Sequence, residues 1–192
     1  MKYFFLFFLL THISSLQAMI HPFEGKPSNA KKYIKERKKI EPWMVSQSIM
    51  LGYIGVLKVL LEEGKYPINT IETDQKRSKI YYAPLHYAVI DEKSEIVKYL
   101  LKKKADINIK SVSPIAEFNN LTPLHLACAG NKPKIMKLLL KKGADIKVKD
   151  GNNKTPLDLI PVNNKEEILK VIKNTKSLNQ KKKDLNEIFT FY

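Results

Sequence analysis

Apolar residues recur at helical spacing in the middle of the chain. Leu124, Ala127 and Cys128 fall on one face of a helix, with small residues where two helices would approach closely. After a break, a second run predicts the apolar face of another helix, formed by Ile135, Met136, Leu138, Leu139 and Leu140. The pattern therefore predicts two short helices joined by a turn.

Start and stop signals bound this helix pair. The Thr122 hydroxyl can accept a hydrogen bond from an otherwise unpaired backbone N–H, and Pro123 has the fixed φ that suits a first helical position. Gly143 follows the second helix, where a residue in the left-handed conformation is favoured. The pair is therefore predicted to begin at Thr122 and to end at Gly143.

The same pattern occurs four times along the chain. Residues 83–108 and 122–147 align closely, because each opens on Pro-Leu-His and closes on Ala-Asp-Ile. Residues 155–174 and 43–69 are weaker copies of the same stretch. Self-similarity at a fixed period indicates stacked structural repeats.

The helix pair has a constant length in three of these copies. The interval from Pro84 to Lys104 equals the interval from Pro123 to Gly143. The same interval separates Met44 from Gly64 in the first copy. Lys104 thus takes the place of a glycine, and a left-handed backbone there would be strained by about 1 kcal/mol.

The loops between the pairs vary in length. The loop from Gly143 to Pro156 is short, whereas the two loops that end at Pro84 and Pro123 are about half as long again. We call the longer loops the first and second fingers. The first finger contains residues 74–79 with Tyr81 and Tyr82, and the second contains residues 111–120 with Phe118. Insertions in repeat proteins gather on one face, which often binds partners.

This pattern resembles the ankyrin repeat, whose opening TPLHLA, central leucine run and closing GAD-I motif are recognisable in residues 122–147. The resemblance covers residues 43 to about 174 and implies an all-α solenoid of stacked helix–turn–helix units with β-hairpin loops. It also implies that the motif histidine ties one unit to the next. The residues of the structural motif are Pro84, His86, Thr122, Pro123, His125, Gly143, Thr155 and Pro156.

We expect four units, at residues 43–82, 83–121, 122–154 and 155–174, between a basic segment at 19–42 and a tail at 175–192. The outer units are atypical, as caps should be. Met44 and Ser46 replace proline and histidine in the first unit.

In the last unit, Asp158 replaces the histidine and Pro161 interrupts the first helix. Outside the repeats, the segment 29–40 is predicted to form a basic helix. Leu185, Ile188 and Phe189 have helical spacing, which favours a capping helix in the tail.

Residues 1–18 have the anatomy of a secretory signal peptide. Lys2 is followed by an apolar run from Tyr3 to Leu10 and by a polar stretch that ends at Ala18. The run is shorter than the roughly 20 residues of a spanning helix. We expect an exported chain without a transmembrane span after signal removal, periplasmic or secreted, with delivery to a host cell also open.

The net charge of +15 comes almost entirely from lysine, since Arg37 and Arg77 are the only arginines. Lys102–Lys104 and Lys141–Lys142 fall in last helical turns, where cations suit the helix dipole. The flanking lysines at 31–39 and 181–183 are less easily explained by the fold. They leave open weak binding to anionic membrane or nucleic acid.

His125 and Cys128 are the candidates for chemistry, as a base with a nucleophile or as two metal ligands. His86 has Val89 where His125 has Cys128, so this position accepts an aliphatic side chain. No cluster of cysteine, histidine or acidic residues has metal-ligand spacing, and no catalytic motif occurs. We therefore assign both residues to the fold, and we expect no cofactor, no metal and no enzyme activity.

The leading hypothesis is a monomeric module that binds an unidentified protein through its fingers and inner helices. The candidate contact residues are Tyr81, Tyr82, Phe118, Leu121 and Lys154 near the fingers, and Met50, Leu51, Ile90 and Asp91 on the inner helices. The alternative hypothesis is a cationic protein that associates with anionic membrane or nucleic acid through its basic flanks.

Overall fold

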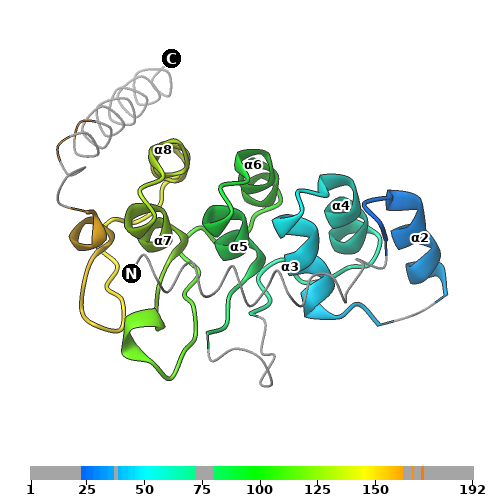
Figure 1. Cartoon of the computed structure of the whole chain (residues 1–192), viewed down its shortest axis with the longest axis horizontal. Helices are drawn as coiled ribbons and strands as arrows, with labels where there is room; N and C mark the ends of the chain where they lie inside the picture. Colours follow the sequence, from blue (N-terminus) through cyan, green and yellow to red (C-terminus); the bar gives the residue numbers. More distant parts are fainter. Residues whose placement is uncertain (1–22, 37–38, 72–79, 162–165, 167–169, 171–192) are drawn as a thin grey trace, which may run out of the picture. The chain divides into compact units, whose positions relative to one another are not determined.

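The computed structural model describes residues 23–36, 39–71 and 80–161, with isolated positions at 166 and 170. The chain forms two compact units that divide between Tyr66 and Pro67, and each is described by itself. The described residues contain helices and no strand (Figure 1). The predicted signal peptide, the tip of the first finger and the tail lie outside the described residues.

The described residues of the first unit form three helices, α2 (Pro27–Lys35), α3 (Pro42–Met50) and α4 (Ile54–Glu62). Helix α4 packs against both α2 and α3. The basic helix expected at 29–40 is α2, which begins earlier than expected because Pro27 occupies its first turn. It ends at Lys35, before the expected end.

Two expectations for the first unit are wrong in register. Helix α3 begins at Pro42 rather than at Met44, because Pro42 is suited to the first helical position. Gly64 does not have the left-handed backbone that we expected; Lys65 has it, with a φ of 54°. Gly64 is instead required by space, since a Cβ there would lie 2.7 Å from the Leu60 carbonyl oxygen.

The part of the second unit that the structure describes contains two complete helix pairs. The first pair is α5 (Pro84–Ile90) with α6 (Ser94–Lys102), and the second is α7 (Pro123–Ala129) with α8 (Pro133–Lys141). Helix α5 packs on α7, and α6 packs on α8, so that the first helices form one layer and the second helices another (Figure 1). Stacking of equivalent helices confirms the predicted repeat architecture.

The core of the second unit consists of the apolar residues that the helical spacing predicted. Leu124, Ala127, Ile135 and Leu139 expose 1% or less of their surface. Burial of each large aliphatic side chain contributes about 1.5 to 3 kcal/mol. Leu138 departs from the expectation, because it is only half-buried on the side of α8.

The ends of the helix pairs also follow the predicted register. Lys104 has a φ of 65° and Gly143 a φ of 92°, which confirms that Lys104 occupies a left-handed position. The last unit begins with a short 3₁₀ helix, η2 (Pro156–Leu159), and Ile160 is extended. Pro161 disfavours helical backbone at the residue before it, so the predicted interruption is confirmed.

The predicted β-hairpin loops do not form strands in the described residues. One isolated antiparallel bridge pairs Tyr81 with Val112. This bridge joins the first finger to the second rather than the two sides of one loop. Where these loops are described, they are irregular, and turns and side-chain hydrogen bonds take the place of the expected strands. None of the described helices is both long enough and apolar enough to cross a membrane.

Candidate interaction surface

The motif histidines link successive repeats of the second unit. The backbone N–H of Ala83 donates to His86 Nδ1 at 3.1 Å, so Nε2 carries the proton and donates to the Leu121 carbonyl at 2.9 Å. Leu121 directly precedes the next helix pair. His86 therefore connects the start of α5 to the start of the following repeat.

His125 repeats this arrangement one unit later. The backbone N–H of Thr122 donates to Nδ1 at 3.1 Å, and Nε2 lies 3.1 Å from the Lys154 carbonyl. The Thr122 hydroxyl lies 2.8 Å from the same Nδ1 and accepts from the backbone N–H of His125. These contacts confirm Thr122 as the N-cap of α7.

Asp158 takes over part of the histidine's role in the last repeat. Its Oδ2 accepts from the backbone N–H of Thr155 at 2.8 Å and from the Thr155 hydroxyl at 2.7 Å. A carboxylate only accepts hydrogen bonds, so Asp158 caps its own turn and cannot donate to a following loop.

Neither motif histidine is suited to chemistry. Both ring nitrogens of each histidine already contact backbone groups, and burial lowers the pKa of His86 to about 4 and lowers the pKa of His125, which makes both imidazoles weaker bases. Burial also raises the pKa of the Cys128 thiol to about 12. A buried neutral thiol is inert as a nucleophile. Among the described residues, no group of three or more histidine, cysteine or acidic side chains could hold a metal ion.

A second ladder, which the sequence analysis missed, joins the loops that follow the second helices. Asn69 Oδ1 accepts from the backbone N–H of Asp106, and Asn108 Oδ1 accepts from that of Asp145, each at 2.9 Å. The residue at the next equivalent position is Lys147, which cannot accept a hydrogen bond. The repeated Ile-Asn in residues 68–69 and 107–108 was the signal that could have revealed it.

The second finger has a defined backbone held by its own polar groups. Ser111 Oγ donates to the Phe118 carbonyl at 2.7 Å and accepts from the backbone N–H of Leu121 at 2.9 Å. The finger also contains the short 3₁₀ helix η1 (Ala116–Phe118). The buried Ser111 hydroxyl therefore closes the base of the finger.

Both sides of the second finger are attached to neighbouring loops. Tyr81 and Val112 exchange two backbone hydrogen bonds of 2.8 and 3.1 Å on one side. On the other side, the backbone N–H of Gly151 donates to the Asn119 carbonyl at 2.9 Å. A Cβ at Gly151 would collide with the Ala116 carbonyl oxygen, so only glycine allows this close approach.

The tip of the finger presents apolar side chains to solvent. Val112 and Ile115 expose 47% and 43% of their surface, and Pro114 and Glu117 beside them are also exposed. An exposed cluster of this kind, on a backbone that is fixed by hydrogen bonds, is typical of a binding surface. We define residues 112–118 as the finger tip.

Comparison with protein families agrees with this architecture. The model of a family described as ankyrin repeats in three copies matches residues 85–184, which is just over half of the chain. The chain belongs to the ankyrin repeat family. Alpha-latrocrustotoxin-Lt1a from Latrodectus tredecimguttatus is 38% identical over 61 residues. That match covers 32% of this chain, and the chain spans about 4% of the toxin's length.

The ankyrin fold separates the predicted contact residues into buried and accessible ones. Tyr82 and Leu121 expose 8% and 5% of their surface, so the fold leaves little of either predicted contact residue accessible to a partner. The Tyr82 ring packs on the rings of His86 and Tyr87, at centroid distances of 5.4 and 5.7 Å. Tyr82 and Leu121, at the bases of the two fingers, therefore belong to the packed interior of the repeats.

The other predicted contacts retain accessible surface. Tyr81, Phe118, Ile90 and Asp91 are half-buried in the second unit, and Lys154 is exposed. In the first unit, Met50 is half-buried and Leu51 exposes 40% of its surface. Tyr81 lies beside the second finger, because it forms a bridge with Val112. Ile90 and Asp91 lie elsewhere, at the end of α5.

Proposed function

We propose that this ankyrin-repeat chain is a non-enzymatic module that binds one protein partner with the tip of its second finger. Ankyrin repeats act as protein–protein interaction modules, and the finger is where this chain departs from the ordinary repeat. The exposed apolar tip on a fixed backbone is the observation that carries the proposal. Because the finger is already ordered, binding would cost little conformational entropy.

The proposal is tested by changing the tip without changing the fold. In the double variant Val112→Ser with Ile115→Ser, both substituted side chains are solvent-exposed in the wild type, so the stability of the repeats should be preserved. In a pull-down at physiological salt, we expect the variant to lose the proteins that the wild-type chain retains. Quantitative mixing with the purified partner should then show at least a tenfold weaker Kd.

Leu51→Ser is the matched control, since Leu51 is the other large apolar residue with an exposed side chain among those described. Binding should survive this substitution. If the control loses binding while the finger variant keeps it, the partner uses the first unit and the proposal for the finger is wrong.

We also propose that the chain is exported. The support is the order of Lys2, the apolar run from Tyr3 to Leu10 and the small residue Ala18. The mass of the mature protein, recovered from its native source, should show that a segment close to residues 1–18 has been removed. A mature form that retains Met1 inside the cell would contradict export.

A further inference from the structure

The outer side of α8 carries lysines without acidic residues between them. Lys134, Lys137 and Lys141 are exposed, at the spacing of one helical face, and Lys142 follows directly. Within the described residues, no acidic group forms an ion pair with any of these four lysines. We define these four lysines as the α8 stripe.

Helix α6 shows how the same face looks when the charges are balanced. It occupies the equivalent place in the preceding repeat, and Glu95 stands where α8 has Lys134. Glu95 forms an ion pair with Lys98 at 2.7 Å. In the described part of the first unit, Lys31 likewise pairs with Glu63 at 2.8 Å.

The helix dipole accounts for only part of the α8 stripe. Lys141 and Lys142 lie at the C-terminal end, where a positive charge is favourable. Lys134 follows Pro133 in the first turn, where the dipole opposes a cation. Lys137 is also repelled by Lys134 one turn before it and by Lys141 one turn after it. The arrangement therefore weakens the isolated helix, which points to a ligand that neutralises it.

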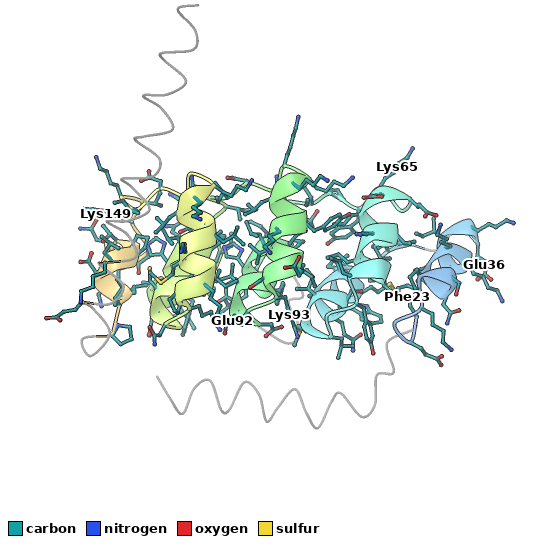
Figure 2. All side chains as sticks on the ribbon, turned by 90° about the horizontal axis from the view of Figure 1, so that it is seen from above. Phe23, Glu36, Lys65, Glu92, Lys93 and Lys149 are labelled. Atoms are coloured by element: carbon teal, nitrogen blue, oxygen red, sulfur yellow. The ribbon has the colours of Figure 1, made fainter. Side chains whose placement is uncertain are left out.

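The surface extends from α8 onto the neighbouring helix. Helices α6 and α8 lie side by side in the outer layer, as Figure 2 shows from above. Lys102 and Lys103, at the end of α6, are exposed at positions equivalent to Lys141 and Lys142. The result is a broad cationic face carried by two adjacent helices.

We propose that this face docks on an anionic lipid bilayer. A bilayer attracts clustered lysines through its surface potential and requires no specific side-chain geometry. Helices α6 and α8 contain no arginine and one aromatic residue, the half-buried Tyr99. Recognition of nucleic acid would favour arginine forks and exposed aromatic rings. The site differs from the basic flanks predicted from the sequence and does not involve the finger.

The test measures binding of the full chain to vesicles of phosphatidylcholine mixed with about one-third phosphatidylserine, against vesicles of phosphatidylcholine alone. The difference between the two isolates the electrostatic part of binding, because apolar insertion contributes to both. Replacement of Lys134, Lys137, Lys141 and Lys142 by glutamine should weaken binding to the anionic vesicles at least tenfold. Doubling the salt concentration should weaken wild-type binding in the same direction.

A matched variant removes the same charge from another place. Lys110, Lys147, Lys149 and Lys154 are exposed in the loops of the same unit, and their replacement by glutamine should change binding less than twofold. Equal losses in both variants would show that net charge alone matters, and would overturn the proposal. So would an absence of binding to anionic vesicles, or tighter binding of the wild type to duplex DNA at the same salt.

A single substitution separates binding from stability. Lys134→Glu gives α8 the arrangement seen in α6, with an acidic residue one turn before Lys137. The thermal midpoint should stay the same or rise, while binding to anionic vesicles falls at least threefold. A fall in stability without a fall in vesicle binding would show that Lys134 serves the fold, contrary to the proposal.

Discussion

The two complete repeats of the second unit have equivalent backbones and different side chains at their turns. Helices α5 and α7 have the same length, as do α6 and α8, and both pairs are related by one constant offset along the chain. The earlier repeat has Ala83, Glu92 and Lys104 where the later one has Thr122, Asn131 and Gly143. At all three positions the later repeat has the residue better suited to its conformation.

This difference shows which positions define an ankyrin repeat in this chain. The buried apolar positions and the histidine links are common to both repeats. The residue types at the N-cap and at the left-handed turns differ between them, although the backbone is the same. Glu92 and Asn131 adopt the same left-handed backbone, with φ of 53° and 51°. Glu92 lies at the turn between α5 and α6, on the edge where Figure 2 labels it. Packing therefore sets the repeat, and the caps adjust its stability.

Removal of a histidine link should produce the largest difference between the two repeats. His86→Ala leaves the buried N–H of Ala83 without its partner, removes one of the two hydrogen bonds to the Leu121 carbonyl, and creates a cavity. We expect a loss of about 2 to 4 kcal/mol in the free energy of unfolding. His125→Ala should cost less, because the contact between its Nε2 and the Lys154 carbonyl is only part-buried, so water can replace the imidazole there. Urea denaturation of both variants measures the difference, and a larger loss for His125→Ala would contradict the explanation.

Acid should weaken the links through the same histidines. His86 stays neutral in the folded chain until its pKa of about 4, whereas in the unfolded chain it gains a proton below about 6.5. The unfolded state therefore binds more protons in this window, and stability falls as pH drops from 6.5 to 4. The contribution of His86 is on the order of 3 kcal/mol. Denaturation at neutral pH and at a pH just above the folded pKa should show a smaller pH effect in His86→Ala than in the wild type.

Gly151→Ala tests how the second finger is attached to the loop that follows it. The attachment of this finger to the loop of the earlier repeat is made separately, through Tyr81. The new methyl group would collide with the Ala116 carbonyl and displace the finger tip. We expect a loss of about 1 to 3 kcal/mol and faster hydrogen exchange at the N–H of residue 151. Gly130→Ala is the control, since its Cβ would meet mainly the flexible end of Lys132. Equal losses in the two variants would contradict a special role for Gly151.

Thr122→Ala makes the cap of the later repeat like that of the earlier one. The hydroxyl that accepts from the backbone N–H of His125 is lost, which should cost about 1 kcal/mol. The thermal midpoint measures the effect. Retention of full stability would mean that the hydrogen bond from the backbone N–H of residue 122 to His125 Nδ1 is enough to cap α7. The equivalent hydrogen bond to His86 Nδ1 caps α5.

Lys104→Gly makes the earlier repeat like the later one at the end of its second helix. Relief of the left-handed strain should raise stability by about 0.5 to 1 kcal/mol. Lys104→Ala removes the same side chain without relieving the strain and should give no gain. The reverse change, Gly143→Lys, should lower stability although nothing lies within 4 Å of its new Cβ. Identical melting curves for all three variants would contradict the effect.

Local patterns made much of the second unit predictable. Thr122 and Pro123 identified the start of α7, the leucine run identified α8, and the constant helix-pair length placed a left-handed residue at Lys104. The same length failed in the first unit, where Pro42 starts the helix early and Lys65 takes the left-handed position. A degenerate repeat has few signals, so a small shift in register leaves its apolar spacing acceptable.

The sequence by itself determined the helix pairs, the repeat period and the structural role of His125 and Cys128, because these depend on contacts a few residues apart or on a motif that recurs. Only the tertiary structure decided which aromatic and aliphatic residues near the fingers are accessible. Tyr82 and Leu121 are buried and Val112 and Ile115 are exposed, although all four lie in the same loops. Their exposure depends on hydrogen bonds between loops that are distant in the sequence, which local spacing does not encode.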